Sequence, residues 1–101
     1  MFTEIVRIRI LPGTEDAFEA AVAKAADVFR RAEGCHGLGL SHCIEEPGLY
    51  AVAIRWRRVE DHTIGFREST LFQEWRALVS PYFAEPPNAT HWTTRIEAVD
   101  F

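Results

Sequence analysis

Residues 38–57, with the sequence LGLSHCIEEPGLYAVAIRWR, predict two neighbouring strands joined by a tight turn. Apolar or aromatic side chains alternate with small or polar ones on both sides of Glu46-Pro47-Gly48, as they do in strands with one buried face. The inward positions are Leu38, Leu40, His42 and Ile44 before the turn, and Tyr50, Val52, Ile54 and Trp56 after it. Because proline and glycine favour tight turns, the stretch predicts a β-hairpin.

Upstream of this hairpin, the sequence predicts a strand followed by a long helix. Residues 4–10 place apolar side chains on one face and Arg7 and Arg9 on the other. Pro12-Gly13 ends the strand, and Thr14 is a suitable N-cap for a helix. Apolar residues then recur every three or four positions, at Phe18, Ala21, Val22, Ala25, Phe29 and Ala32. We expect Gly34 to end the helix in the left-handed conformation.

Downstream, residues 60–79 predict a second helix, broken near Ser69, and residues 91–99 predict a last strand. The order β-α-β-β-α-β is typical of the ferredoxin-like α+β fold, a four-stranded antiparallel sheet with two helices on one face. We expect one domain over residues 1–101, because this length is close to the commonest domain size.

The two faces of the predicted sheet differ in composition. The face covered by helices is expected to carry Val6, Leu40, Ile54 and Ile96. The opposite face carries many charges, on Arg7, Arg9, Arg55, Arg57, Arg95, Glu45 and Glu97. Composition alone leaves this charged face either in water or against a second subunit.

Composition and charge exclude several classes of protein. The formal net charge is −4, and the basic residues are scattered, so we expect no nucleic-acid partner. No apolar run is long enough to span a bilayer and no signal peptide is recognisable, so we expect a cytoplasmic protein that does not bind membranes. Cys35, Cys43 and the histidines lack metal-ligand spacing, so we expect no metal site.

Residues 62–76, with the sequence HTIGFRESTLFQEWR, concentrate aromatic and polar side chains in the predicted second helix. Two interpretations fit this stretch. The aromatic spacing is what any amphipathic helix needs to pack on a sheet. The same residues also suit an aromatic pocket with a few polar groups directed at a substrate.

Short motifs along almost the whole chain carry a family resemblance. They are Pro12-Gly13, Glu33-Gly34-Cys35, Ile44-Glu45-Glu46-Pro47 with Tyr50, Trp56 with Val59-Glu60-Asp61-His62, Phe66-x-x-Ser69-x-x-Phe72, and Pro87-x-x-x-His91. On these residues the chain resembles the antibiotic biosynthesis monooxygenase (ABM) family, a dimeric α/β-barrel group.

The resemblance implies a homodimer whose two sheets pack face to face, with a pocket between the sheet and the helices of each subunit. The charged face then becomes the dimer contact. Characterised members of the family include oxygenases that oxidise quinol-like or polycyclic phenolic substrates with dioxygen and without metal or flavin. Other members degrade haem, with an iron-binding histidine where this chain has Arg76. Arginine offers no lone pair to iron, so haem degradation is disfavoured.

Three histidines are candidates for the base that such an oxygenase needs to remove a phenol proton. Many ABM sequences carry a histidine where this chain has Phe66, and His62 lies one helical turn earlier on the same face. The alternative for His62 is an exposed first-turn residue. His42 faces inward by its alternation, which also fits a core histidine satisfied by a hydrogen bond. His91 follows a proline-rich loop that could form a lid, or it is a loop-edge residue.

Six aromatic residues are candidates for substrate binding. They are Tyr50, Trp56, Phe66, Phe72, Trp75 and Trp92. Tyr50 and Trp56 share the inward face of one strand and offer O–H and N–H donors. The aromatic residues of the second helix suit either a stacking wall for a flat substrate or an ordinary core.

Two functions therefore remain open from the sequence. The first is a cofactor-independent monooxygenase that oxidises a small aromatic or quinol-like compound with dioxygen. The second is a non-catalytic homodimer that binds an apolar small molecule in the same cavity. An oxygenase pocket and a binding pocket need the same kinds of lining residues, so the sequence does not distinguish the two functions.

Overall fold

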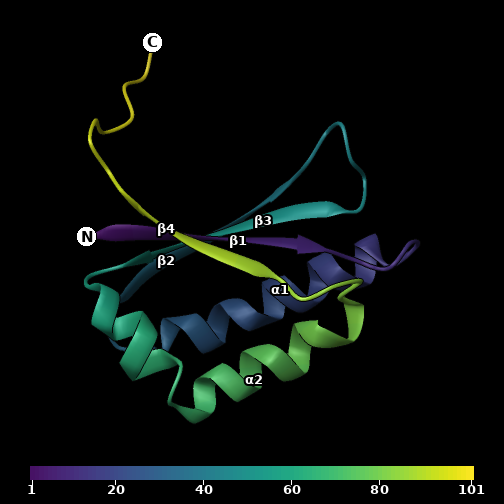
Figure 1. The fold of residues 1–101 in the computed structure, drawn as a ribbon, viewed down its shortest axis with the longest axis horizontal. Coiled ribbons are helices and arrows are strands. Elements are labelled where there is room, and N and C mark those ends of the chain that lie inside the picture. Colours follow the sequence, from purple (N-terminus) through teal and green to yellow (C-terminus); the bar gives the residue numbers. More distant parts are fainter.

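The computed structural model describes residues 1–101 and shows a four-stranded sheet with two α-helices on one side (Figure 1). The elements are β1 (Phe2–Arg9), α1 (Glu15–Arg30), β2 (Cys35–His42), β3 (Leu49–Trp56), the π-helical turn η1 (Asp61–Phe66), α2 (Thr70–Val79), the 3-10 turn η2 (Ser80–Tyr82) and β4 (Asn88–Thr93). The strand order is β2-β3-β1-β4, and all neighbouring strands are antiparallel. The predicted ferredoxin-like α+β fold is confirmed.

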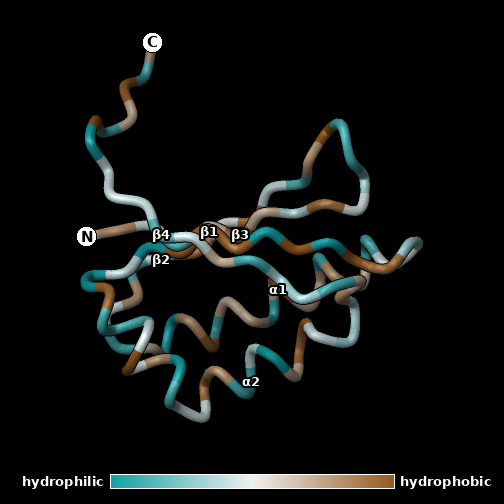
Figure 2. The backbone as a smooth tube through the Cα atoms, in the orientation of Figure 1, coloured by the Kyte–Doolittle hydropathy of each residue, from teal (hydrophilic) through white to brown (hydrophobic).

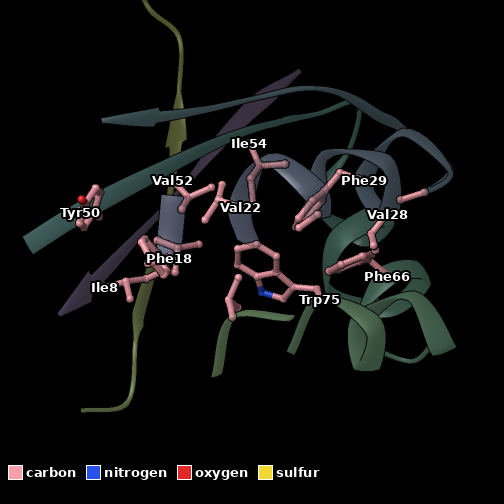
Figure 3. Close-up of a cluster of buried hydrophobic side chains, with 14 of the residues drawn as sticks. Ile8, Phe18, Val22, Val28, Phe29, Tyr50, Val52, Ile54, Phe66 and Trp75 are labelled. Atoms are coloured by element: carbon pink, nitrogen blue, oxygen red, sulfur yellow. The ribbon is translucent and has the colours of Figure 1, made fainter. Parts of the chain in front are cut away.

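The hydrophobic core lies between the helices and the inner face of the sheet (Figure 3). Side chains of α1 at helical spacing, including Phe18, Val22 and Phe29, meet inward residues of β1 and β3 such as Ile8 and Ile54. Figure 2 shows hydrophobic stretches at the centre of the sheet, where β1 and β3 lie. Each fully buried side chain of this size contributes roughly 1.5–3 kcal/mol of transfer free energy. No helix combines the length and the apolar character needed to cross a membrane.

Of the two breaks predicted at the helices, the one near Ser69 is confirmed and the end of the first helix lies earlier than predicted. Gly34 has a φ of +81°, the left-handed conformation, but α1 already ends at Arg30, with Arg31 as its C-cap, so Gly34 lies beyond the helix. A side chain at this position would collide with the carboxylate of Asp61, so glycine also allows the two segments to approach. Ser69 is extended at the N-terminus of α2 and separates this helix from η1. Its Oγ donates a hydrogen bond to the Phe66 carbonyl at 2.7 Å.

The last strand lies earlier than the sequence predicts, at Asn88–Thr93 rather than residues 91–99. It pairs with β1, and Thr93 stands opposite Phe2, so β1 has almost no residues left beyond this point. Without a pairing partner, residues 94–101 leave the sheet and project away from it (Figure 1). The placement of Ile96 on the covered face was therefore wrong, and this side chain is 85% exposed.

The inward alternation of β2 also ends sooner than predicted. The strand stops at His42, and Ile44 is exposed. The Cys43 N–H donates to the Leu49 carbonyl at 2.9 Å, which closes the hairpin. Residues 43–48 then project on the side of the sheet that lies away from the helices (Figure 1), so no apolar layer covers Ile44.

Asp61 is a buried carboxylate that ties η1 to the end of β3. Its oxygens accept hydrogen bonds from Arg57 Nε and from the backbone N–H of Arg58, both at 3.2 Å. The Arg57 guanidinium, helped by Arg58, holds the pKa of Asp61 below its usual range. The ionised carboxylate therefore stabilises the fold above its unfolded-state pKa, and this stabilisation is lost as the pH falls through the lower folded-state pKa.

We predict that Asp61→Asn lowers the urea midpoint at neutral pH, and that its difference from the wild type shrinks as the pH falls below about 4. Urea unfolding at a series of pH values measures this. Asp27→Asn is the control, because Asp27 forms exposed pairs with Arg30 and Arg31 and such pairs contribute little. A difference between Asp61→Asn and the wild type that stays constant down to about pH 3 would contradict the prediction.

Candidate functional site

Two buried titratable side chains, Glu4 and His62, meet under the sheet. Each is only 4% exposed. Glu4 points inward because it shares the strand parity of Phe2 and Val6, which are also buried. His62 comes from η1, which packs against the end of β3. Buried carboxylates are rare unless they are paired, so we expect hydrogen-bond partners for the Glu4 carboxylate.

The partners form a continuous chain of hydrogen bonds. Trp56 Nε1 donates to Glu4 Oε1 at 3.0 Å. His62 Nε2 lies 3.0 Å from Glu4 Oε2, and His62 Nδ1 lies 3.0 Å from His91 Nε2. The register of the sheet assists this arrangement, because His91 on β4 stands directly opposite Glu4 on β1. We call Glu4, His62 and His91 the carboxylate–histidine chain.

Donor and acceptor roles in this chain follow from the carboxylate. An ionised Glu4 can only accept, so His62 Nε2 carries the proton of that contact. In neutral His62 the lone pair is then on Nδ1, where it accepts a hydrogen bond from His91 Nε2–H. A carboxylate that fixes the tautomer of a histidine in this way leaves the other ring nitrogen free to act as a base.

A cavity of about 240 Å³ opens beside Glu4 and His62. Its apolar walls come from Phe72 and Trp75 on α2 and from Phe83, and the loop at Pro86 and Pro87 borders it. Two guanidinium groups, those of Arg67 and Arg76, also line it. The volume is below the ~300–1,000 Å³ usual for drug-sized ligands, so the cavity suits a small molecule.

Four of the predicted site residues line this cavity or lie directly behind it. His62, Phe72 and Trp75 belong to its lining. Trp56 is fully buried behind it and holds Glu4 through its indole N–H. Phe66 lies in the core, with its ring centroid 5.0 Å from that of Phe29, and Figure 3 shows it on the same side of α1 as Trp75.

Tyr50 and His42 lie at another part of the sheet. Tyr50 stands opposite Ile8 on β1, whereas Ile54 stands opposite Glu4. The Tyr50 hydroxyl donates to Glu19, and burial, together with that carboxylate, raises the pKa of the hydroxyl. His42 stacks on the Tyr50 ring with centroids 4.2 Å apart and is exposed. It therefore faces the helix side as expected, but it lies at the rim of the sheet and does not reach the cavity.

His91 and Trp92 point to opposite faces of β4. His91 faces the helix side, where it contacts His62 and packs its ring 5.5 Å from that of Phe2. Trp92 faces the other side, is 57% exposed and donates through Nε1 to Thr90 Oγ1 at 2.8 Å. The structure thus brings His62 and His91 together and separates Trp92 from the cavity.

Three residues of this site were not predicted from the sequence: Glu4, Arg67 and Arg76. The signal for Glu4 was present, since a carboxylate with the parity of Val6 and Ile8 falls on the apolar face of its strand. The arginines carry no such signal, because exposed helical arginines are ordinarily solvated. Their position depends on how η1 and α2 lie against the sheet.

Comparison with known proteins gives a consistent result. Residues 1–78 match the family model described as antibiotic biosynthesis monooxygenase. The uncharacterized protein YczJ of Bacillus subtilis is 36% identical over 92 residues, which cover 91% of this chain and 97% of YczJ. A crystal structure from Bordetella bronchiseptica, of a protein classed with the antibiotic biosynthesis monooxygenases, is 45% identical and has a TM-score of 0.92, covering 94% of this chain and 97% of that chain.

A more distant structure has the same architecture. SnoaB, a cofactor-independent oxygenase from Streptomyces nogalater, superposes with a TM-score of 0.75 at 16% identity. The match covers 98% of this chain and 97% of SnoaB. At this level of identity, the likeness shows a shared fold.

Proposed function

Because the chain belongs to the antibiotic biosynthesis monooxygenase family, we propose that it oxidises a small aromatic or quinol-like compound with dioxygen and without a cofactor. The observation that carries this proposal is the carboxylate–histidine chain beside an aromatic cavity. The likeness of fold to SnoaB, a cofactor-independent oxygenase, supports it.

The first chemical step is proton removal from a phenolic hydroxyl. His62 Nδ1 is the base, and Glu4 holds the other ring nitrogen so that the lone pair stays on Nδ1. In this structure His91 occupies that lone pair, and the substrate hydroxyl replaces it. His91 is exposed, so it can then carry the proton from His62 to solvent.

The phenolate that results is electron-rich enough to react with dioxygen directly. In the substrate, a ring carbon ortho or para to the phenolic oxygen, which bears one hydrogen, becomes a carbonyl by taking one oxygen atom, so that the phenol becomes a quinone. The ring hydrogen and the phenolic hydrogen leave with the second oxygen atom as water. The substrate supplies all four electrons, so this stoichiometry requires no external reductant. The apolar walls formed by Phe72 and Trp75 exclude water from the anion.

Oxygen consumption by metal-free protein tests this proposal. A panel of anthrones, quinols and dihydroxynaphthalenes covers the substrate class, and labelled dioxygen reports whether one oxygen atom enters the product. We expect uptake that saturates with substrate and survives chelator. No uptake above buffer over the whole panel would contradict the proposal.

A binding protein without turnover is the second candidate, and one observation favours it. Both ring nitrogens of His62 are already engaged, by Glu4 and by His91, so neither carries a free lone pair. If the ligand leaves the contact between His62 and His91 intact, the cavity binds without chemistry. Saturable binding of the panel compounds with no oxygen uptake would support this second function.

We also propose that the protein forms a homodimer through the outer face of the sheet, the face away from the helices. Helices leave this face uncovered (Figure 1), and its centre carries Ile5, Ala53 and the exposed Trp92. Of the charged residues predicted for this face, Arg7, Arg9 and Arg55 lie on its strands, and Arg9 is already paired with Glu46 and Glu85. The prediction was wrong for the others, which lie beyond the ends of the strands: Glu45, Arg57, Arg95 and Glu97. The tail at residues 94–101, which has hydrophobic positions (Figure 2), projects on the same side.

We predict that Trp92→Lys converts the dimer to a monomer. A central interface tryptophan typically contributes about 2 kcal/mol or more, which raises the dissociation constant by roughly 30-fold or more. Sedimentation or light scattering measures the mass, which should be twice 11.5 kDa for the wild type. Ile64→Lys is the control, because Ile64 is equally exposed but lies on η1. A wild-type monomer at micromolar concentration, or a Trp92→Lys dimer, would contradict the prediction.

A further inference from the structure

We propose that the ligand of the cavity is a planar phenolic compound that carries a carboxylate or another acidic group, held by Arg67 and Arg76. This inference rests on the proposed function of the same cavity and specifies its substrate class. It follows from the two guanidinium groups of the lining, which the chemistry of proton removal does not use.

The two guanidinium groups converge on one aromatic wall. Arg67 Cζ lies 5.2 Å from the centroid of the Phe72 ring, and Arg76 Cζ lies 6.0 Å from the same centroid. Phe72 and Arg76 are one helical turn apart on α2, and Arg67 follows η1. Both guanidinium groups lie over the Phe72 ring, so a flat ligand that packs against this wall lies next to two cations.

Arg67 and Arg76 have no anionic partner in the protein. The arginines that form ion pairs, each within 4.0 Å of a carboxylate, are Arg9, Arg30, Arg31, Arg57 and Arg58. The carboxylate of Glu4 lines the same cavity, but its two oxygens are bound to Trp56 and His62. The guanidinium donors of the cavity are therefore free for a ligand.

A guanidinium group selects for acids by geometry as well as charge. Its planar fork can donate two parallel hydrogen bonds to a carboxylate, whereas a neutral ring offers only a cation–π contact. The chain has a formal net charge of −4, so an acidic ligand is attracted only where cations gather locally. Two unpaired arginines beside a stacking surface provide such a place.

Isothermal titration with a matched pair of ligands tests the inference. The pair is 2-naphthol and 6-hydroxy-2-naphthoate, which share the ring and hydroxyl and differ in the acid. We expect the wild type to bind the acid roughly tenfold or more tightly than the naphthol. In the Arg67→Gln/Arg76→Gln variant, binding of the acid should weaken while binding of the naphthol is retained. The ratio of the two affinities should then fall close to one. Arg30→Gln, an exposed arginine on α1, is the control and should keep the wild-type ratio.

Equal binding of the two ligands by the wild type, binding of neither, or a preference for the acid that survives in the double variant would overturn the inference. The outcome is independent of turnover. Oxygen uptake on neutral quinols without any preference for acids would remove this inference and leave the oxygenase proposal standing. A clear preference for the acid without uptake would confirm the anion site and contradict the oxygenase proposal.

Discussion

His62→Gln is expected to slow oxygen consumption by roughly 10²–10⁴-fold, the usual contribution of a general base. Glutamine can still donate an amide hydrogen bond to the buried Glu4 carboxylate. The variant therefore avoids the loss of about 1–3 kcal/mol of folding stability that an unsatisfied buried acceptor would cause. An amide has no basic nitrogen, so the phenol proton has no acceptor. The loss should appear in kcat, with little change in ligand binding.

Two histidine controls make this prediction specific. His42→Ala removes an exposed histidine that stacks on Tyr50 away from the cavity, and uptake should be unchanged. His91→Ala removes the exposed end of the carboxylate–histidine chain, where water can take over proton transfer, so uptake should fall by less than about tenfold. Abolished uptake in His91→Ala combined with retained uptake in His62→Gln would assign the base to His91 instead.

The sequence was sufficient for the fold because local patterns determine it. Alternation predicted β3 and its pairing with β2, and helical spacing predicted the buried face of α1. The errors in the predicted strand ends arise because pairing with a neighbouring strand, rather than the strand's own alternation, determines where a strand stops. The last strand ends at Thr93 because β1 offers no further partner, a constraint that the residues of β4 do not themselves contain.

The candidate site was only partly predictable for a related reason. His62, Phe72 and Trp75 belong to one short stretch, but they line one cavity because the break at Ser69 separates η1 from α2. The contact of His62 with Glu4 and His91 joins three elements, and it depends on sheet register and on the position of η1. Strand alternation predicted the same inward direction for Tyr50 and Trp56 and could not distinguish their roles. The two residues lie at opposite ends of β3, so Tyr50 packs on Phe18 and Trp56 packs on His62.

Glu4→Gln is expected to reduce kcat by roughly 10²–10⁴-fold, although Glu4 itself transfers no proton. The amide oxygen of glutamine can accept from Trp56 Nε1, which leaves the amide N–H₂ to face His62 Nε2. That nitrogen must then be the acceptor, so the ring proton moves to Nδ1. The lone pair that serves the substrate is lost without any change in the shape of the cavity.

Nitrogen chemical shifts of the His62 ring distinguish this positioning role from a merely structural one. We expect the wild type to carry its proton on Nε2 and Glu4→Gln to carry it on Nδ1, with binding of 2-naphthol unchanged. Glu19→Gln is the matched control, because Glu19 also accepts a hydrogen bond from an aromatic side chain, the Tyr50 hydroxyl, but lies away from the cavity. An inverted tautomer with full activity would show that His62 Nδ1 is not the base. An unchanged tautomer with lost activity would show that the carboxylate acts through its charge rather than through the position of the His62 proton.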